Sequence, residues 1–233
     1  MKLFYEGKAK QIYEGEDDKS VVMRFKDDTT AQDGRVKAII PNKGIWNHQI
    51  SDEVFTYLNK QDIPTHWLKK INERDHECIK LTMIPLEFIV RNRYAGSASQ
   101  RLGIAEGLIC HSPIYELSYK SDALHDPMIN DTHVIALGIL NKSELDECWE
   151  LSRRINQLLI TFFNEIGIEL IDFKIEFGFD SNQKITLGDE ISPDCCRLWD
   201  KKSQEKLDKD RFRQKLGKEA EAYQEICYRL NQR

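Results

Sequence analysis

The sequence predicts an α+β fold arranged in two lobes. Short strand patterns fill about the first 35 residues, and helices and strands alternate after them. At 233 residues the chain is long enough for one large domain or two modest ones. We place the boundary at Met83, giving residues 1–83 and 84–233, because Pro85 cannot donate to a strand ladder and predicts an edge, a bulge or a connection there.

The first lobe is predicted to be mainly antiparallel sheet. Glycine and acidic turns separate the strand patterns "KLFYEG", "KQIYEG" and "SVVMRFKD". Between Lys43 and Lys60 the apolar residues change to helical spacing, with Trp46, Ile50 and Val54 on one stripe. A single helix is therefore expected to follow the first strands.

The second lobe is predicted to mix strands with longer helices. Strand patterns resume over residues 76–96, and Ser97 is a plausible cap for a short helix after them. Asn141 and Glu144 have the spacing of a capping box for a long helix that Gly167 ends. Two strands over 170–178 and 184–192 and a last amphipathic helix complete the chain.

Composition excludes several classes of protein. The chain is 40% hydrophobic and 31% charged, without the roughly 18 consecutive apolar residues that a membrane span needs. A net charge of −5 argues against non-specific nucleic-acid binding. Six cysteines without a C-x-x-C pair predict reduced thiols and no zinc site. With no signal-like N-terminus, we expect a cytoplasmic protein that binds neither membrane nor nucleic acid.

The segment "LIDFKIEFG" concentrates charge on one face of a strand. Asp172, Lys174 and Glu176 alternate with apolar residues, so they share a face opposite the core face. That charged face is consistent with either solvent or an active site.

A second acidic segment favours the active site. "GDEISPD" brings Asp189, Glu190 and Asp194 back on the expected partner strand, and so many acids repel one another unless a cation lies among them. Glu176 and Asp189 are the candidate Mg²⁺ ligands. Strict alternation would turn Asp189 to the apolar side, so we predict a bulge at Gly188. The alternative is that two strand ends simply meet solvent.

Two basic segments are candidate phosphate sites. "RNRYAGSASQR" places Arg91, Arg93 and Arg101 around a turn of small residues, and Arg197 follows the acidic cluster. "EGKAKQIY" places Lys8 and Lys10 at a glycine turn between two strands. A solubilising arginine loop and an exposed basic hairpin are the alternatives.

Seven segments then occur in a recognisable order. They are "GKAKQIY", "DDTTAQDG", "MIPLEFIVRNRYAGS", "HDPMIN", "LIDFKIEFG", "GDEISPD" and "RLWDKKSQEKLDKDRFR". Over nearly the whole chain they resemble the phosphoribosylaminoimidazole-succinocarboxamide synthase (SAICAR synthetase) family. The resemblance implies a kinase-like or ATP-grasp-like cleft between a nucleotide lobe and a substrate lobe. It also implies an ATP-dependent ligase that joins L-aspartate to 4-carboxy-5-aminoimidazole ribonucleotide (CAIR), and a homodimer.

The resemblance also implies roles for individual residues. Lys174 would stabilise the carboxylate under attack, and Asp172 would orient Lys174 or accept a proton from the amine. ATP would be held by Lys8, Ala9, Lys10 and Met83, and Mg²⁺ by Glu176 and Asp189. Arg91, Ser97, Asp126 and Arg197 would lie on the substrate side.

One segment departs from the family pattern, and two other functions compete with the ligase. Cys195 and Cys196 stand where the family usually has small or hydroxyl residues, and a thiol is a poor hydrogen-bond donor. The competing functions are a small-molecule kinase with the same cleft and a nucleotide-binding regulatory protein without turnover. Basic side chains at 91, 174 and 197 disfavour the regulatory protein, because desolvated charges are costly to keep without a chemical role.

Overall fold

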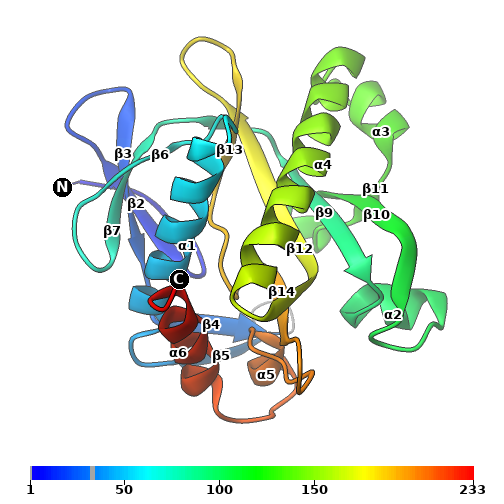
Figure 1. Ribbon diagram of the computed structural model, residues 1–233. Coiled ribbons are helices and arrows are strands. Elements are labelled where there is room, and N and C mark those ends of the chain that lie inside the picture. Colours follow the sequence, from blue (N-terminus) through cyan, green and yellow to red (C-terminus); the bar gives the residue numbers. More distant parts are fainter. Residues whose placement is uncertain (1, 32–34) are drawn as a thin grey trace.

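The computed structural model describes residues 2–31 and 35–233, so the end of the "DDTTAQDG" segment lies outside the described residues. An antiparallel five-stranded sheet forms the N-terminal part (Figure 1). A separate hairpin joins β4 (Asp28–Ala31) to β5 (Val36–Ile39). In spatial order, the sheet consists of β1 (Leu3–Glu6), β2 (Lys10–Glu14), β3 (Ser20–Phe25), β7 (Asp75–Ile79) and β6 (Trp67–Lys70).

A second sheet is built around the long strand β12 (Ile168–Phe179). The strands β8 and β9 pair with one side of β12, and β13 and β14 pair with the other. Pro85 lies between β8 and β9, inside the second sheet, and explains the gap in this ladder, while the expected connection between lobes stays a prediction. The other strands are β8 (Thr82–Met83), β9 (Leu86–Arg93), β10 (Ile109–Tyr119), β11 (Met128–Ile129), β13 (Ile185–Gly188) and β14 (Cys196–Asp200).

The side of β12 that faces β13 and β14 also has a gap. Pairing with β14 ends at Phe173, and pairing with β13 begins at Glu176. The loop from Asp189 to Cys195 passes the gap, and its Cys195 carbonyl accepts a 2.9 Å hydrogen bond from the Lys174 amide. This loop therefore brings the second acidic segment alongside the charged face of β12.

Two long helices cover the sheets, and a third packs on the first. The helices α1 (Lys43–Lys60) and α4 (Lys142–Glu165) contact each other, and α6 (Glu219–Leu230) packs on α1 (Figure 1). The capping box of Asn141 and Glu144 is present at the start of α4, as predicted. Shorter helices are α2 (Gly96–Leu102), η1 (Asp122–Leu124), α3 (Asp131–Ala136) and α5 (Asp210–Arg213).

The prediction that Ser97 caps α2 is wrong. The residue that precedes this helix is Ala95, and Ser97 lies inside the first turn. Its hydroxyl instead lies 3.4 Å from a guanidinium nitrogen of Arg91, so the residue belongs to the arginine cluster described below.

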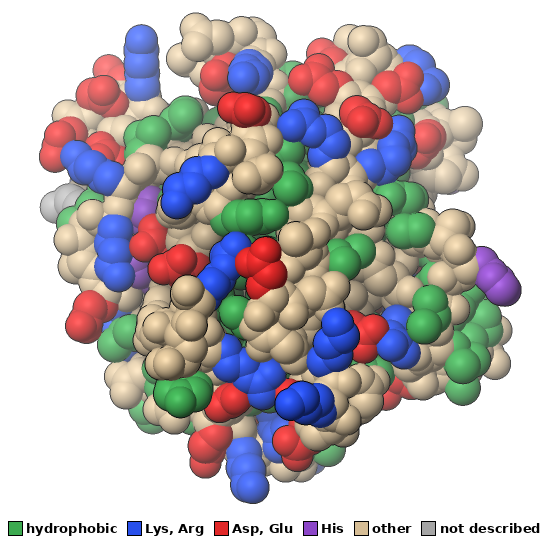
Figure 2. Space-filling view, in the orientation of Figure 1, with side chains coloured by type: hydrophobic (Ala, Val, Ile, Leu, Met, Phe, Trp, Pro, Cys, Tyr) green, Lys and Arg blue, Asp and Glu red, His purple; other side chains and the backbone are tan. Residues whose placement is uncertain are grey.

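The α+β fold class is confirmed. The chain passes from the first sheet to the second between Ile79 and Thr82, while one apolar core extends from Val21 to Leu230 across both sheets. The proposed division at residue 83 stays a prediction. No helix in the described ranges is long and apolar enough to cross a membrane. Figure 2 shows acidic and basic side chains interspersed over one face.

Two histidines lie in the core beside the first sheet. His48 and His76 are at most 1% exposed, and the His76 ring stacks on Trp67 with ring centroids 3.6 Å apart. Burial lowers the pKa of His48 to about 4 and that of His76 to about 2. Both side chains are therefore neutral in the folded protein at neutral pH.

We expect stability to fall as the pH drops below about 6.5. Below this pH the two histidines bind protons in the unfolded state but stay neutral in the folded state. Each histidine should therefore lower the free energy of unfolding by roughly 1 kcal/mol per pH unit, until the pH reaches its folded pKa. Urea unfolding at pH 7 and pH 5 measures this. His48→Leu should reduce the pH dependence, whereas substitution of the exposed His111 by Gln should not. An unchanged slope in His48→Leu would contradict the assignment.

Candidate active site

The charged face of β12 points into the protein rather than into solvent. The side chains of Asp172 and Glu176 are 5% and 3% exposed, and that of Lys174 is 25% exposed. A strand so placed needs partners for its charges, because burial of an unpaired charge is very unfavourable. Two groups of side chains supply them, one at Lys174 and one at Asp172.

The first group surrounds the Lys174 ammonium. Its Nζ lies 2.5 Å from Glu176 Oε1, 3.0 Å from Asp189 Oδ2 and 3.5 Å from an oxygen of Glu87. Burial by itself would lower the pKa of Lys174, but the carboxylates of Asp189, Glu176 and Glu87 outweigh burial and raise it well above its usual range. Lys174 is therefore a fixed positive charge and not a base.

Two more lysines complete this group. Lys10 pairs with Asp189 and lies 3.0 Å from Glu190 Oε1, while Lys120 Nζ lies 2.5 Å from Glu176 Oε2. Burial would raise the pKa of Asp189, but Lys10 and Lys174 hold it well below its usual value. Asp189 is thus held in its ionised form, and it shares one cation, Lys174, with Glu176.

The donor set of Glu176 and Asp189 fits Mg²⁺. Mg²⁺ is usually held by one or two carboxylates together with substrate phosphates. The carboxylates of Glu176 and Asp189 both contact the Lys174 ammonium, so they lie close enough to share a metal ion. Within residues 2–31 and 35–233 no group of three or more acidic, histidine or cysteine ligands is found. A metal here would take its remaining oxygen ligands from water or from substrate phosphates.

The predicted bulge at Gly188 is wrong in its position. Pairing between β12 and β13 is regular from Phe179–Ile185 to Glu176–Gly188, and β13 ends there. Asp189 itself adopts a left-handed backbone with φ 57°, a conformation that aspartate tolerates better than most residues, and the alternation is broken at this point. Gly188 instead leaves room for the Met83 side chain, because a Cβ on Gly188 would lie 3.3 Å from Met83 Sδ.

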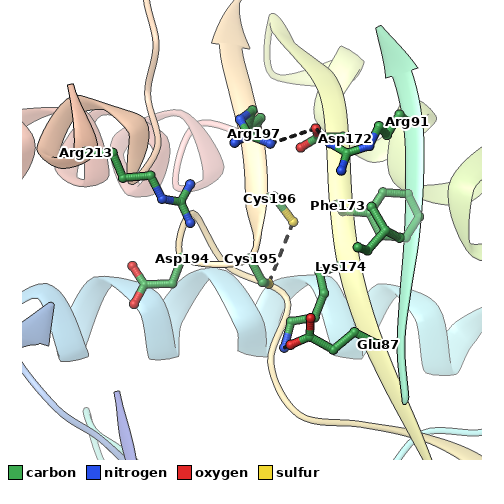
Figure 3. A pocket seen from close by; sticks show the side chains of 11 residues that line it. Glu87, Arg91, Asp172, Phe173, Lys174, Asp194, Cys195, Cys196, Arg197 and Arg213 are labelled. Atoms are coloured by element: carbon green, nitrogen blue, oxygen red, sulfur yellow. Dashed lines mark hydrogen bonds and ion pairs between the residues drawn. The ribbon is translucent and has the colours of Figure 1, made fainter. Parts of the chain in front are cut away.

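The second group joins three strands across the sheet. Asp172 on β12 pairs in register with Arg91 on β9 and with Arg197 on β14. Its Oδ2 accepts hydrogen bonds from Arg91 Nη1 at 2.7 Å and from Arg197 Nη1 at 2.8 Å (Figure 3). Asp172 therefore fixes two arginines, and the expectation that it orients Lys174 is not met by these contacts.

Glycine is required at the start of α2 to admit one of these arginines. Gly96 has φ 52°, and a Cβ on it would lie 2.2 Å from Arg197 Nη2. The Arg197 Nε donates to Asp210 Oδ2 at 2.7 Å, and the Arg91 Nε donates to Glu116 Oε2 at 2.7 Å. Each guanidinium is thus held by two carboxylates.

A cavity of about 240 Å³ connects the two groups. Figure 3 shows the side chains that line it, with Arg91, Asp172 and Arg197 at one end and Lys174 beside Glu87 at the other. The lining residues are Glu87, Ile89, Arg91, Asp172, Phe173, Lys174, Asp194, Cys195, Cys196, Arg197 and Arg213.

The other predicted site residues lie around this region or in the N-terminal sheet. Lys8 is half exposed on the turn between β1 and β2, and its Nζ lies 2.9 Å from Asp122 Oδ1 on η1. Ala9 accepts a backbone hydrogen bond from Lys26. Asp126 accepts a 2.7 Å hydrogen bond from the Ser121 amide, which makes it part of the same turn as Asp122. Lys8 thus links the first sheet to this turn.

Sequence reasoning missed several residues of the site. Glu87, Glu116, Lys120, Asp210 and Arg213 come from four elements or loops and reach the site only through tertiary contacts. None stands in a charge pattern that distinguishes it from a surface residue. Glu87 lies in the family segment "MIPLEFIVRNRYAGS", and Asp210 and Arg213 lie in "RLWDKKSQEKLDKDRFR", so the resemblance was the available signal for these three residues.

The fold and the paired-charge cavity are those of an enzyme that gathers anionic substrates. The SAICAR synthetase family model matches residues 3–230. A curated relative from Fusobacterium nucleatum, named phosphoribosylaminoimidazole-succinocarboxamide synthase, is 50% identical over 232 residues, covering 100% of this chain and 98% of the relative. The chain therefore belongs to the SAICAR synthetase family, whose members are ATP-dependent ligases of purine biosynthesis.

Solved structures agree with this assignment. The synthase from Ehrlichia chaffeensis superposes with a TM-score of 0.97 at 42% identity, covering 99% of this chain and 98% of that one. A SAICAR synthetase in complex with ADP has a TM-score of 0.95 at 45% identity, with coverage of 98% and 97%. The small-molecule kinase is not favoured by these comparisons.

We expect Asp172→Ala to lower the free energy of unfolding by about 3 kcal/mol. Its loss leaves two guanidinium groups without a shared buried counter-charge, although Glu116 and Asp210 still hold their other faces. Urea unfolding measures the change. Substitution of the exposed Asp18 by Ala is the matched control and should have an effect within about 0.5 kcal/mol. Equal stability of the two variants would contradict this view of Asp172.

Proposed function

We propose that this chain joins L-aspartate to CAIR with consumption of ATP, giving SAICAR, ADP and phosphate. One observation carries the proposal. Lys174 with its two convergent carboxylates lies two residues along β12 from the Arg91–Asp172–Arg197 group, an arrangement that would set a phosphate and metal site beside an anion site. The names of the relatives and the ADP complex of a neighbouring structure support the same reaction.

The chemistry explains why such a site is needed. A carboxylate resists attack by an amine because it is already negative and offers no leaving group. Transfer of the ATP γ-phosphoryl group to the CAIR carboxylate gives an acyl phosphate and ADP, and the aspartate amine then opens the acyl phosphate and releases phosphate. Both steps depend mainly on positioning and on the neutralisation of several anions held close together.

The ATP side of the site is assigned to the first sheet and the strand beside it. Lys8, Ala9 and Lys10 would hold the phosphates from the turn between β1 and β2, and Met83 would border the adenine. Glu176 and Asp189 would hold Mg²⁺, which supplies Lewis-acid neutralisation of phosphate charge when bound. Lys10, Lys120 and Lys174, which pair with these carboxylates, support an anionic occupant, because each could donate to a phosphate oxygen once a metal neutralises the carboxylates.

The substrate side is assigned to the cavity. Arg91, Ser97 and Arg197 would seat the imidazole ribonucleotide, and Asp126 would lie nearby on the substrate side. Lys174 would stabilise the carboxylate as its charge develops. Its raised pKa supports this role, because the group stays an ammonium at any pH where the protein works.

Glu87 is a better candidate than Asp172 for accepting the amine proton. Asp172 Oδ2 already accepts hydrogen bonds from two guanidinium groups, so this carboxylate is engaged in holding the arginines. Burial, together with the charges of Glu176 and Asp126, raises the pKa of Glu87. Asp172 would then position the arginines, and Glu87 would take the proton.

We also propose a division into two lobes, a cellular compartment and an oligomeric state for the enzyme. A nucleotide lobe over residues 1–83 and a substrate lobe over 84–233 would place ATP and CAIR on opposite sides of the cleft. The six free thiols, all in the described part of the chain, support a reducing and hence cytoplasmic compartment. Family resemblance supports a homodimer.

Steady-state assays with and without aspartate test the reaction. SAICAR should form only when ATP, CAIR and aspartate are all present, whereas a kinase would release its product without the amine. Lys174→Met should lower kcat at least about 100-fold while the circular dichroism spectrum stays that of the wild type. The matched control is Lys184→Met, which changes an exposed lysine at the β12–β13 turn and should keep wild-type kcat. Full activity in Lys174→Met would reject the role of Lys174.

The metal assignment predicts a specific change in Mg²⁺ dependence. Glu176→Gln should raise the Mg²⁺ concentration for half-maximal activity at least about tenfold, because one of two protein oxygen ligands loses its charge. Calorimetric titration of ADP in the presence of Mg²⁺ gives a second readout that needs no turnover. Glu150→Gln, on the exposed face of α4, should match the wild type in both measurements. If Glu176→Gln also matches it, Glu176 does not hold the metal.

A further inference from the structure

Two adjacent thiols line the cavity on the side opposite Arg91. Cys195 and Cys196 are free, and their Sγ atoms lie 4.0 Å apart (Figure 3). Both are lining residues of the cavity, and Cys195 is partly exposed while Cys196 is buried. The other four cysteines lie on separate elements: β7, β10, α4 and α6.

The local backbone holds the two sulfur atoms in this position. Ser192 donates its amide hydrogen to Cys195 Sγ at 3.3 Å, and Cys195 Sγ lies 3.2 Å from the Glu190 carbonyl oxygen. Cys196 is fixed by strand pairing, where it lies opposite Phe173. The pair is therefore a preformed feature of the cavity wall rather than two independently moving side chains.

The separation of the sulfur atoms fits a bridging atom better than a direct bond. A disulfide needs its sulfur atoms about 2.05 Å apart, and adjacent residues reach that geometry only with strain. Two bonds of about 2.3 Å to sulfur at the roughly 95° angle of a pyramidal trivalent atom span about 3.4 Å, so the sulfur atoms, now 4.0 Å apart, would approach each other by about 0.6 Å on binding. A soft atom that binds sulfur strongly and can form bonds to two thiols suits both the separation of the sulfur atoms and their chemistry.

We propose that Cys195 and Cys196 form a binding site for trivalent arsenicals, which close a ring across the two thiols inside the substrate cavity. In the reaction of an organoarsenic(III) oxide, two As–S bonds form and the As–O bonds break. The two thiol protons leave with that oxygen as one molecule of water, and no oxidant or reductant is needed. Burial and the neighbouring thiol raise the pKa of Cys196, so this residue rests as the thiol form that the reaction consumes.

An arsenical bound here would reach the centre of the proposed active site. The Cys195 carbonyl accepts the hydrogen bond from the Lys174 amide, and the cavity that would hold the organic group also contains Lys174, Arg91 and Arg197. Occupation should therefore exclude an anionic substrate. This consequence rests on the proposed function, but binding of the arsenical itself does not.

Intact-protein mass spectrometry with phenylarsine oxide tests the site. At one equivalent the wild type should gain one phenylarsenic group, retain it in excess glutathione and lose it to 2,3-dimercaptopropanol. Cys195→Ser and Cys196→Ser should each lower the apparent affinity at least about 100-fold, because the one remaining thiol cannot close the ring with arsenic. Cys110→Ser and Cys227→Ser are the matched controls and should keep the glutathione-resistant adduct.

Two results would overturn the proposal. One is a wild-type protein that gains no glutathione-resistant adduct, and the other is an adduct that survives in Cys195→Ser or in Cys196→Ser. Circular dichroism of each variant excludes loss of folding as the cause of a negative result. If the protein forms the adduct but has no ligase activity, the arsenical site stands and the proposed function is rejected. If the protein is an active ligase but forms no adduct, the proposed function stands and the arsenical site is rejected.

Discussion

The site depends on compensation of charge along the inward face of β12. Three acids at the site each pair with two cations: Arg91 and Arg197 for Asp172, Lys120 and Lys174 for Glu176, and Lys10 and Lys174 for Asp189. A buried charge without a partner would make the folded strand much less stable. The lysines and arginines therefore compensate the charge that the fold buries on this face.

The gaps in strand pairing allow this charge to lie in the middle of a sheet. β12 has a strand partner on at least one side along most of its length and on both sides at Asp172, Phe173, Gly178 and Phe179, yet the loop from Asp189 to Cys195 interrupts the pairing beside Lys174. A continuous ladder would fill that position with another strand and its side chains. The interruption leaves room for a cavity while the backbone of Lys174 still has a hydrogen-bond partner.

The period of a strand sets the spacing between the two parts of the site. Asp172 and Lys174 point to the same side and lie about 6.6 Å apart along the strand, since each residue advances roughly 3.3 Å. A rigid strand thereby holds an arginine-lined pocket next to a lysine and two carboxylates. A reaction that brings several anions together needs this fixed proximity, which a loop would provide less accurately.

The sequence alone determined the α+β class, the helix over 43–60, the capped helix that begins after Asn141 and the alternation of charge in "LIDFKIEFG". Those features follow from local periodicity and capping, which act over a few residues. Tertiary structure decided which way the charged face points, because alternation is the same for a face in water and a face in a cavity. It also decided the partners of that face, such as Lys120 and Asp210, which are distant in sequence, and the turn of Asp189, which depends on one backbone angle that residue types do not specify.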